Sequence, residues 1–294
     1  MKKIIVIVGP TASGKTNLSI ELAKIFQGEI INADSVQIYK KFDIGSAKIT
    51  LEETQNIKHH LINKIHPEAS YNIYNFQKDV REIIHQIKTP FLVGGSGLYI
   101  KAALFDYELL PEPNKINENN LNLEQLLTII KQKDPDLILD TKNSRRIIRA
   151  YQQLFQEKLR SQKKGKNIPL FDILFIYLDI ERNILKQRIT LRLEKMLEQG
   201  FIEEVKYLME NYPKANLNVI GYKEIKSFLN KEIDLEKTKE LIIRNSLKYA
   251  KKQKTWFKNQ TPNIKVINGL SPKLIVTTEI MIKNFLKKEK INND

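Results

Sequence analysis

The sequence predicts an α/β fold, in which a parallel sheet is flanked by helices and a small helical domain is inserted. Three observations predict this fold. Residues 4–8 form a β-branched apolar run typical of a buried strand, a glycine-rich phosphate motif follows at once, and residues 17–26 then place apolar side chains on one face of a helix. Strand, loop and helix in this order are typical of the start of a parallel α/β sheet.

The glycine-rich stretch at residues 9–16 matches the P-loop pattern G-x-x-x-x-G-K-[ST]. Its members are Gly9, Pro10, Thr11, Ala12, Ser13, Gly14, Lys15 and Thr16. The glycines let the backbone wrap around a di- or triphosphate, Lys15 adds a positive charge, and the Thr16 hydroxyl is placed to hold Mg²⁺. An ordinary glycine-rich turn is the alternative. The pattern predicts a diphosphate or nucleotide site in a P-loop NTPase-like core, but it names no reaction.

Composition excludes several classes of protein. The 294 residues are 41% hydrophobic, which is enough for a core, and they include no cysteine, so a disulfide framework, a thiolate metal site and a cysteine nucleophile are excluded. Four histidines make no convincing metal site. The apolar N-terminal run ends at Gly9 and Pro10, too early for a signal peptide or a membrane span. We therefore expect a soluble, cytoplasmic protein with no membrane association, and a monomer by default.

A formal charge of +15 and a pI near 9.6 indicate an anionic partner, either a nucleic acid or an anionic surface. Lysine enrichment from an AT-rich genome is the alternative. The distribution favours a polyanion, because residues 141–170 hold nine cations against one acid and residues 244–258 hold six cations and no acid. The cations are Lys142, Arg145, Arg146, Arg149, Lys158, Arg160, Lys163, Lys164 and Lys166, then Arg244, Lys248, Lys251, Lys252, Lys254 and Lys258.

Further strands are predicted at residues 29–32 and 89–93, and polar residues follow each of them. Because ligands bind beyond the carboxyl ends of parallel strands, we expect Asp34 to face the same crevice as the P-loop. Asp34 is a candidate Mg²⁺ ligand or general base, and an Asx turn or a helix cap is the alternative. Three glycines surround Ser96, so the backbone there is predicted to approach a ligand closely and to expose the Ser96 hydroxyl; a tight strand-to-helix turn is the alternative.

The rest of the chain is predicted to be mostly helical. Helices are expected at residues 72–87, with Ser70 or Asn72 as the cap, and at 181–199, 202–211 and 235–257, with a loop at 39–48. Arg188 and Arg192 lie four residues apart on one helix face, where they either close over phosphates or form an ordinary exposed pair. The pattern breaks near residues 106–120, short basic helices follow at 121–133 and 140–156, and strand composition returns at 171–179. The predicted division is a core of residues 1–107 and 171–294 with a helical insertion at residues 108–170.

Together, these segments resemble the tRNA dimethylallyltransferase (isopentenyltransferase) family. The resemblance rests on GPTASGKT at 9–16, NADSVQIYKKFDIGSAK at 32–48, HHLI at 59–62 and VGGSGLYIKAAL at 93–104. It continues through SRRIIRA at 144–150, GFIEEV at 200–205, VIGYKEI at 219–225 and YAKKQKTWF at 249–257. The motifs follow in order over nearly the whole chain, and together they are far more specific than the P-loop alone.

This resemblance implies transfer of a dimethylallyl group from dimethylallyl diphosphate to N6 of the adenine just 3′ of the anticodon. The tRNAs would be those that read codons starting with U, and the products would be N6-(dimethylallyl)adenosine and diphosphate. Mg²⁺ would be the cofactor, and the anticodon stem-loop of tRNA would be the macromolecular partner. The target base would have to leave its stack to reach a buried site.

The family's site residues fall on matching positions of this sequence. Its two tRNA-contacting segments correspond to Asp34, Ser35, Val36 and Gln37, and to Arg145, Arg146, Ile147, Ile148 and Arg149. The diphosphate site corresponds to residues 11–16, with Lys15 neutralising the leaving group, and Asp34 takes the position of the base. Ser96 stands where the family usually has threonine; the hydroxyl that bonds the diphosphate or the nucleotide is kept, so we expect activity to persist.

Two departures from the family's pattern affect the residues expected to bind tRNA. The family usually has an arginine soon after the Leu-Pro that opens the insertion, whereas residues 111–120 offer only Lys115. Asn218 stands where some members carry an arginine. The insertion is also shorter than usual, so we expect its binding to tRNA to be weaker or to be distributed over lysines.

Three competing hypotheses explain less of the sequence. A small-molecule or nucleoside kinase would use the P-loop with ATP and the arginine pair at 188 and 192 as a lid, but it leaves the two basic patches unexplained. A non-catalytic RNA-binding module explains the charge but leaves Asp34 and the P-loop without a role. An enzyme that prenylates a free adenine nucleotide has no use for a basic insertion.

Overall fold

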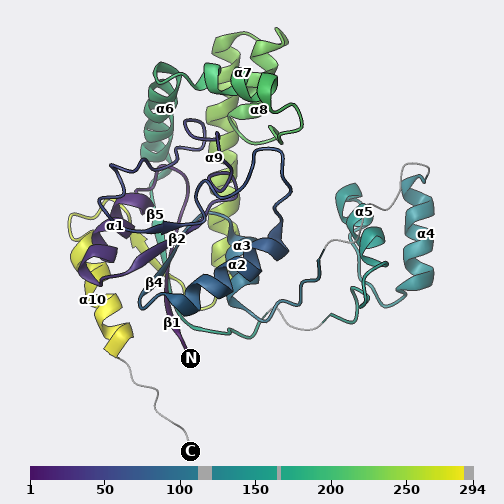
Figure 1. The fold of residues 1–294 in the computed structure, drawn as a ribbon, viewed down its shortest axis with the longest axis horizontal. Helices are drawn as coiled ribbons and strands as arrows, with labels where there is room; N and C mark the ends of the chain where they lie inside the picture. Colours follow the sequence, from purple (N-terminus) through teal and green to yellow (C-terminus); the bar gives the residue numbers. More distant parts are fainter. Residues whose placement is uncertain (112–120, 164–166, 288–294) are drawn as a thin grey trace, which may run out of the picture.

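A six-stranded parallel sheet forms the centre of the fold in the computed structural model, which describes residues 1–111, 121–163 and 167–287 (Figure 1). The strands are β1 (Lys3–Val8), β2 (Glu29–Ala33), β3 (His59–His60), β4 (Pro90–Gly94), β5 (Asp172–Asp179) and β6 (Lys265–Asn268). Their order across the sheet is β3-β2-β4-β1-β5-β6, and each neighbouring pair is parallel. The carboxyl ends of these strands therefore meet at one edge of the sheet.

Helices cover both faces of the sheet and one of its ends. They are α1 (Lys15–Ile25), α2 (Ile73–Gln86), α3 (Gly97–Leu104), α4 (Leu123–Lys133), α5 (Ser144–Gln153), α6 (Arg182–Glu198), α7 (Phe201–Asn211), α8 (Tyr222–Leu229), α9 (Leu235–Gln260) and α10 (Leu274–Lys287). Within the described ranges, every helix is too short or too polar to cross a bilayer.

Side chains alternate between the two faces of the sheet, and each face has its own apolar core. On β1, Ile4 and Val6 pack with residues of α2, α3 and α9, whereas Ile5 and Ile7 pack with residues of α1 and α10. Both sets are fully buried. Burial on both faces explains why β1 is a continuous β-branched run instead of an alternating one.

A third apolar core lies where α6, α7, α8 and α9 gather, beyond the edge at which the strands end (Figure 1). It includes Phe201 of α7, Tyr222 of α8 and Leu193 of α6. Phe42, from the loop after β2, inserts into the same core. This core therefore joins the four helices to the loop that follows β2.

The insertion stands apart from the sheet, and its helices α4 and α5 pack against each other (Figure 1). The chain leaves and re-enters the core side by side, because Asp106 N donates to Ile168 O (3.0 Å) and Leu170 N donates to Leu104 O (2.9 Å). Lys115, and Lys164 and Lys166 of the basic segment at 141–170, lie outside the described residues.

The predicted strands and long helices are confirmed, although their bounds shift by up to four residues. Asn72, not Ser70, caps α2, since its side chain accepts hydrogen bonds from the backbone N–H groups of Tyr74 and Asn75 (2.9 and 3.2 Å). The structure adds β3, β6, α3, α8 and α10, which the sequence did not predict. β3 has only two residues and β6 is an exposed edge strand, so neither shows a buried-strand pattern.

Candidate active site

The P-loop lies at the carboxyl end of β1, as the sequence predicts, and bends around two glycines. A Cβ at Gly9 would lie 2.9 Å from the carbonyl oxygen of Leu178, so a side chain there would collide with β5. Gly14 begins α1 with φ of 89°, a conformation that side-chain-bearing residues rarely adopt. No side chain caps α1, which leaves its first N–H groups for an anion. The Ser13 hydroxyl is buried without a partner among the described residues, and a phosphate oxygen would satisfy it.

Two arginines of α6 lie directly on this loop. Arg188 Nη1 donates to Ala12 O (3.3 Å), and Arg192 Nη1 donates to Thr11 Oγ1 (3.2 Å). Both side chains are half-buried. The pair is therefore not the ordinary exposed pair that was one alternative, since both side chains contact the P-loop.

The loop lysine is held in the same place. Lys15 Nζ donates to Pro10 O (2.6 Å). Burial lowers the pKa of Lys15 to about 8, with the Asp34 carboxylate opposing this and the Arg192 guanidinium adding to it. Burial likewise lowers the pKa of Arg192, against the opposite effect of Asp34. A dianionic ligand would relieve the crowding of these two cations.

Asp34 lies at the end of β2 and interacts electrostatically with the P-loop cations. Its Oδ1 accepts a hydrogen bond from Val36 N (2.9 Å), and its own N–H donates to Asn32 Oδ1 (3.2 Å). The Asx turn expected as the alternative is therefore present. The turn occupies only Oδ1 of the carboxylate, and no hydrogen bond from the described residues reaches Oδ2. The turn therefore orients the carboxylate and leaves Oδ2 available to accept a hydrogen bond or a proton.

The Gly-Gly-Ser-Gly turn after β4 packs against the protein itself. Ala33, the Gln253 side chain and the Trp256 ring leave no room for a Cβ at Gly94, Gly95 and Gly97, respectively. These glycines therefore serve the strand-to-helix packing that was the alternative to close approach by a ligand. Ser96 N donates to Ala33 O (3.3 Å), and the Ser96 side chain makes no capping bond to α3. Ser96, a half-buried residue, thus lies with its backbone beside the end of β2.

Sequence reasoning missed two residues of α9 at this edge. Gln253 Nε2 donates to Gly95 O (2.9 Å), which fixes the amide, and its Oε1 is buried with no partner among the described residues. Tyr249 lies one turn earlier; burial of the phenol, and then the Asp34 carboxylate, raise its pKa, although 43% of the residue is exposed. Both belong to the motif at residues 249–257. They lie four residues apart, which places them on one face of the helix, and this spacing was the available signal.

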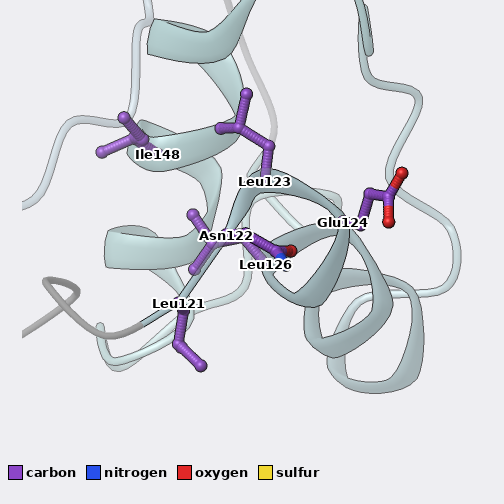
Figure 2. A pocket seen from close by; sticks show the side chains of 6 residues that line it. All are labelled: Leu121, Asn122, Leu123, Glu124, Leu126 and Ile148. Carbon is purple, nitrogen blue, oxygen red and sulfur yellow. The ribbon is translucent and has the colours of Figure 1, made fainter.

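The insertion presents its arginines differently. Arg145 and Arg146 are exposed on α5, and Arg149 is half-buried. Ile147 is only 1% exposed and packs in the core of the insertion, so its side chain is not available to RNA in this arrangement. Ile148 lines a pocket of about 570 Å³ between α4 and α5, together with Leu121, Asn122, Leu123, Glu124 and Leu126 (Figure 2).

A metal site made only of protein groups is not found in the described part of the chain, where no three His, Cys, Asp or Glu residues lie close enough to share an ion. Mg²⁺ at phosphate sites takes one or two protein oxygens and completes its shell with phosphate and water. Thr16, exposed in the first turn of α1, offers such an oxygen. The residues present therefore fit a metal that arrives with a diphosphate.

A parallel sheet with a P-loop at its carboxyl edge puts the chain in the class of P-loop proteins. The chain belongs to the IPP transferase family: the model described as IPP transferase matches residues 37–260, and one described as isopentenyl transferase matches residues 2–68. A tRNA dimethylallyltransferase of onion yellows phytoplasma is 55% identical over 292 residues, 98% of this chain and 100% of that protein. The enzyme of Acholeplasma laidlawii is 51% identical over 286 residues, 97% and 99% of the two chains.

Solved structures share the fold. A tRNA isopentenylpyrophosphate transferase of Bacillus halodurans superposes with a TM-score of 0.75 at 33% identity, covering 97% of each chain. A eukaryotic dimethylallyltransferase, described as acting on tRNA, superposes with a TM-score of 0.82 at 28% identity, covering 97% of this chain and 80% of its own. The similarity thus extends over nearly all of this chain, insertion included.

Proposed function

We propose that the chain transfers a dimethylallyl group from dimethylallyl diphosphate to N6 of an adenine in tRNA, next to the 3′ side of the anticodon. The tRNAs would be those that read codons starting with U, and N6-(dimethylallyl)adenosine and diphosphate are the products. Membership of the family and the name shared by its relatives support the reaction. The observation that carries the site is the convergence of Lys15, Arg192 and Asp34 at the carboxyl edge of the sheet.

The P-loop side binds the leaving group. The N–H groups at the start of α1, Lys15, Arg188 and Arg192 surround the place where a diphosphate fits. Negative charge grows on the diphosphate as the allylic C–O bond breaks, so fixed cations there stabilise the transition state more than the ground state. Mg²⁺, held by Thr16 and the diphosphate oxygens, would supply further charge neutralisation.

Asp34 serves as the general base. N6 loses a proton as the C–O bond breaks and the bond from N6 to the dimethylallyl carbon forms. Asp34 Oδ2 accepts this proton, because it has no hydrogen-bond partner among the described residues. The Asx turn with Val36 N keeps the carboxylate in one orientation. The proton later passes to solvent, so the carboxylate is regenerated after each transfer.

The RNA is bound by two regions. The segment of Asp34, Ser35, Val36 and Gln37, with Ser96 beside it, forms the lip of the site, and a flipped adenine would enter there. The second region is the insertion, predicted at residues 108–170 and described for α4 and α5, in which Arg145, Arg146 and Arg149 would contact phosphates of the anticodon stem-loop. Ser96 keeps the hydroxyl of the family's usual threonine but lacks its methyl group, and we expect activity to persist.

The direct test is incubation of the purified chain with unmodified tRNA, dimethylallyl diphosphate and Mg²⁺, without ATP, followed by mass analysis of the nucleosides. The expected result is one added dimethylallyl group on adenosine, and none when the target adenine is replaced by guanine. Consumption of ATP without RNA would instead support a kinase. Modification of free AMP but not of tRNA would support a nucleotide prenyltransferase.

A further inference from the structure

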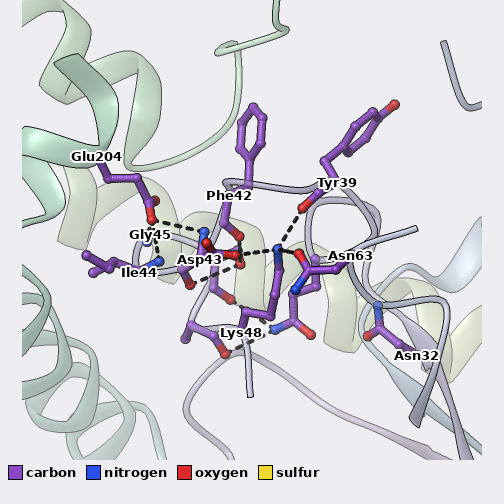
Figure 3. A network of polar contacts seen from close by, with 12 residues as sticks. Asn32, Tyr39, Phe42, Asp43, Ile44, Gly45, Lys48, Asn63 and Glu204 are labelled. Atoms are coloured by element: carbon purple, nitrogen blue, oxygen red, sulfur yellow. Dashed lines mark hydrogen bonds and ion pairs between the residues drawn. The ribbon is translucent and has the colours of Figure 1, made fainter. Parts of the chain in front are cut away.

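The loop after β2, residues 37–48, has little regular structure, yet polar contacts hold it firmly (Figure 3). At its end, the Lys48 ammonium donates to Tyr39 O (2.6 Å), Asn63 Oδ1 (2.6 Å) and Asp43 Oδ1 (2.7 Å). The Lys48 side chain is only 3% exposed. All three protons of the ammonium are therefore satisfied, two of them within the loop and one by Asn63 outside it, and the contact with Tyr39 O joins the loop's two ends.

The middle of the same loop is held from outside by one carboxylate. Glu204, near the start of α7, accepts hydrogen bonds from the backbone N–H groups of three successive residues: Asp43 (3.0 Å), Ile44 (2.6 Å) and Gly45 (3.1 Å). Its Oε1 also accepts from Tyr222 OH (2.7 Å). Three successive N–H groups that converge in this way form an anion-binding concavity, which a side chain of the protein fills here.

Aromatic side chains lie under these hydrogen bonds, and together with Glu204 they form what we call the socket for residues 42–45. The rings of Phe42 and Phe201 lie 4.9 and 5.1 Å from the ring of Tyr222, which is fully buried. The rings of Phe201 and Tyr222 also leave no room for a side chain at Gly45. The loop therefore packs closely against α7 and α8, and Glu204 holds the backbone of residues 43–45 beside these rings.

This socket is connected to the RNA-facing lip through Gln37. Gln37 Nε2 donates to Ser46 O (3.0 Å) and Ala47 O (3.2 Å), the carbonyls that directly follow the N–H groups bound by Glu204. Both amide protons of Gln37 are used in this way. Its Oε1 is left as the atom that can accept a hydrogen bond from a ligand.

We propose that Glu204 is a positioning residue for tRNA: it acts through residues 43–47 to hold Gln37 so that its carbonyl oxygen, not its NH₂ group, meets the RNA. The group recognised on the RNA is then a donor, either a base N–H or a 2′-hydroxyl. This inference rests on the proposed function, because it assumes that the lip at Gln37 contacts tRNA. It also gives a role to GFIEEV and VIGYKEI, which supply Glu204 and Tyr222.

The first variant is Glu204→Gln, which keeps the shape of the side chain but turns an NH₂ group toward backbone donors. Its matched control is Glu203→Gln, which removes the same charge from the neighbouring, exposed position of α7. For Glu204→Gln we expect the dissociation constant for an anticodon stem-loop, and KM for tRNA, to rise about tenfold. The kcat at saturating tRNA, the affinity for diphosphate and the salt dependence of RNA binding should stay as in the control.

The second measurement separates positioning from folding. Tyr222→Phe removes one hydroxyl from Glu204 and keeps the ring, so it should weaken RNA binding in the same direction, by about threefold. In a double-mutant cycle, Glu204→Gln should cost little once Gln37→Ala is present, because both changes act on one contact.

Additive effects of the Gln37 and Glu204 changes would overturn the proposal, as would equal losses in the Glu203→Gln control or a parallel loss of diphosphate binding. Stem-loop binding is measured without dimethylallyl diphosphate, so the coupling is tested even if no transfer occurs. A wild-type chain that binds the stem-loop without modifying it would contradict the proposed reaction alone.

Discussion

We propose that the P-loop edge and the insertion both bind anionic ligands through arginines, but the two regions hold these arginines differently. At the P-loop edge, Arg188 and Arg192 are half-buried and donate to the loop that they face. On the insertion, Arg145 is exposed, and the Arg146 side chain, 59% exposed, pairs with Asp140 across 3.3 Å. The arginines of the P-loop edge are therefore held against the loop before a ligand arrives, whereas Arg145 and Arg146 of the insertion are largely exposed to solvent.

The packing below the two sets explains this difference. The P-loop edge is built on strands whose side chains are fully buried on both faces, while the insertion stands on a small cluster of its own. Fixed cations cost no reorganisation when charge develops on a leaving group, which catalysis requires. Solvated arginines suit a polymer whose phosphates are bound mainly through counterion release. The comparison predicts that substitutions at the P-loop edge alter the rate of transfer, and that substitutions on the insertion alter the salt dependence of RNA binding.

The sharpest test of the comparison is Asp34→Asn. Asparagine keeps the acceptor for Val36 N, so the Asx turn persists, but it cannot take the proton from N6. We expect the single-turnover rate to fall about 10²- to 10⁴-fold while stem-loop binding stays near that of the wild type. Glu198→Gln, which removes a carboxylate from an exposed position at the end of α6, is the control. Turnover retained in Asp34→Asn would remove the base assignment and weaken the contrast between the two regions.

A smaller effect concerns the pH dependence of diphosphate binding. Because burial lowers the pKa of Lys15 to about 8, the free protein loses this charge at higher pH, whereas a bound diphosphate favours the protonated amine. Proton uptake on binding means that affinity is level below pH 8 and falls by up to about tenfold per pH unit above it. Calorimetric titration of inorganic diphosphate measures this.

Lys15→Arg is the control for that titration, because a guanidinium stays charged throughout the range. Its profile contains only the ligand's own ionisation, and the difference from the wild type isolates Lys15. Identical profiles in the two proteins would mean that Lys15 is protonated over the whole range and that the cations of the edge are less crowded than the geometry indicates.

The sequence predicted those parts of the molecule whose signal is local. The strand of residues 4–8 is buried on both faces, so composition alone reveals it, and the P-loop is contiguous because a phosphate is bound by successive N–H groups. The cap of α2 was narrowed to two residues by the same kind of local chemistry. Helix α8, by contrast, was not predicted, because its Tyr222 is buried by contacts from distant segments.

The site was predictable to the same extent. Asp34 and the P-loop could be paired because parallel strands end at one edge, but nothing local connects Asp34 with Tyr249. The sequence predicts a loop around Lys48 but does not reveal its buried contacts, because its partners lie 5, 9 and 15 residues away in irregular backbone. The carboxylate of Glu204 bonds backbone N–H groups, which any residue other than proline supplies, so no sequence pattern marks the far side of that contact.

The smallest effect is expected on the insertion, from the pair Arg145→Ala and Arg149→Ala. If both contact phosphates, the slope of log binding constant against log salt becomes shallower by about 1 to 2, and affinity weakens similarly for matched and unmatched stem-loops. The control, Lys265→Ala with Lys273→Ala, removes the same charge from the edge strand β6 and the start of α10. A lower single-turnover rate at saturating RNA would contradict the comparison, since arginines that only bind the phosphates of the polymer have no differential contact with the transition state.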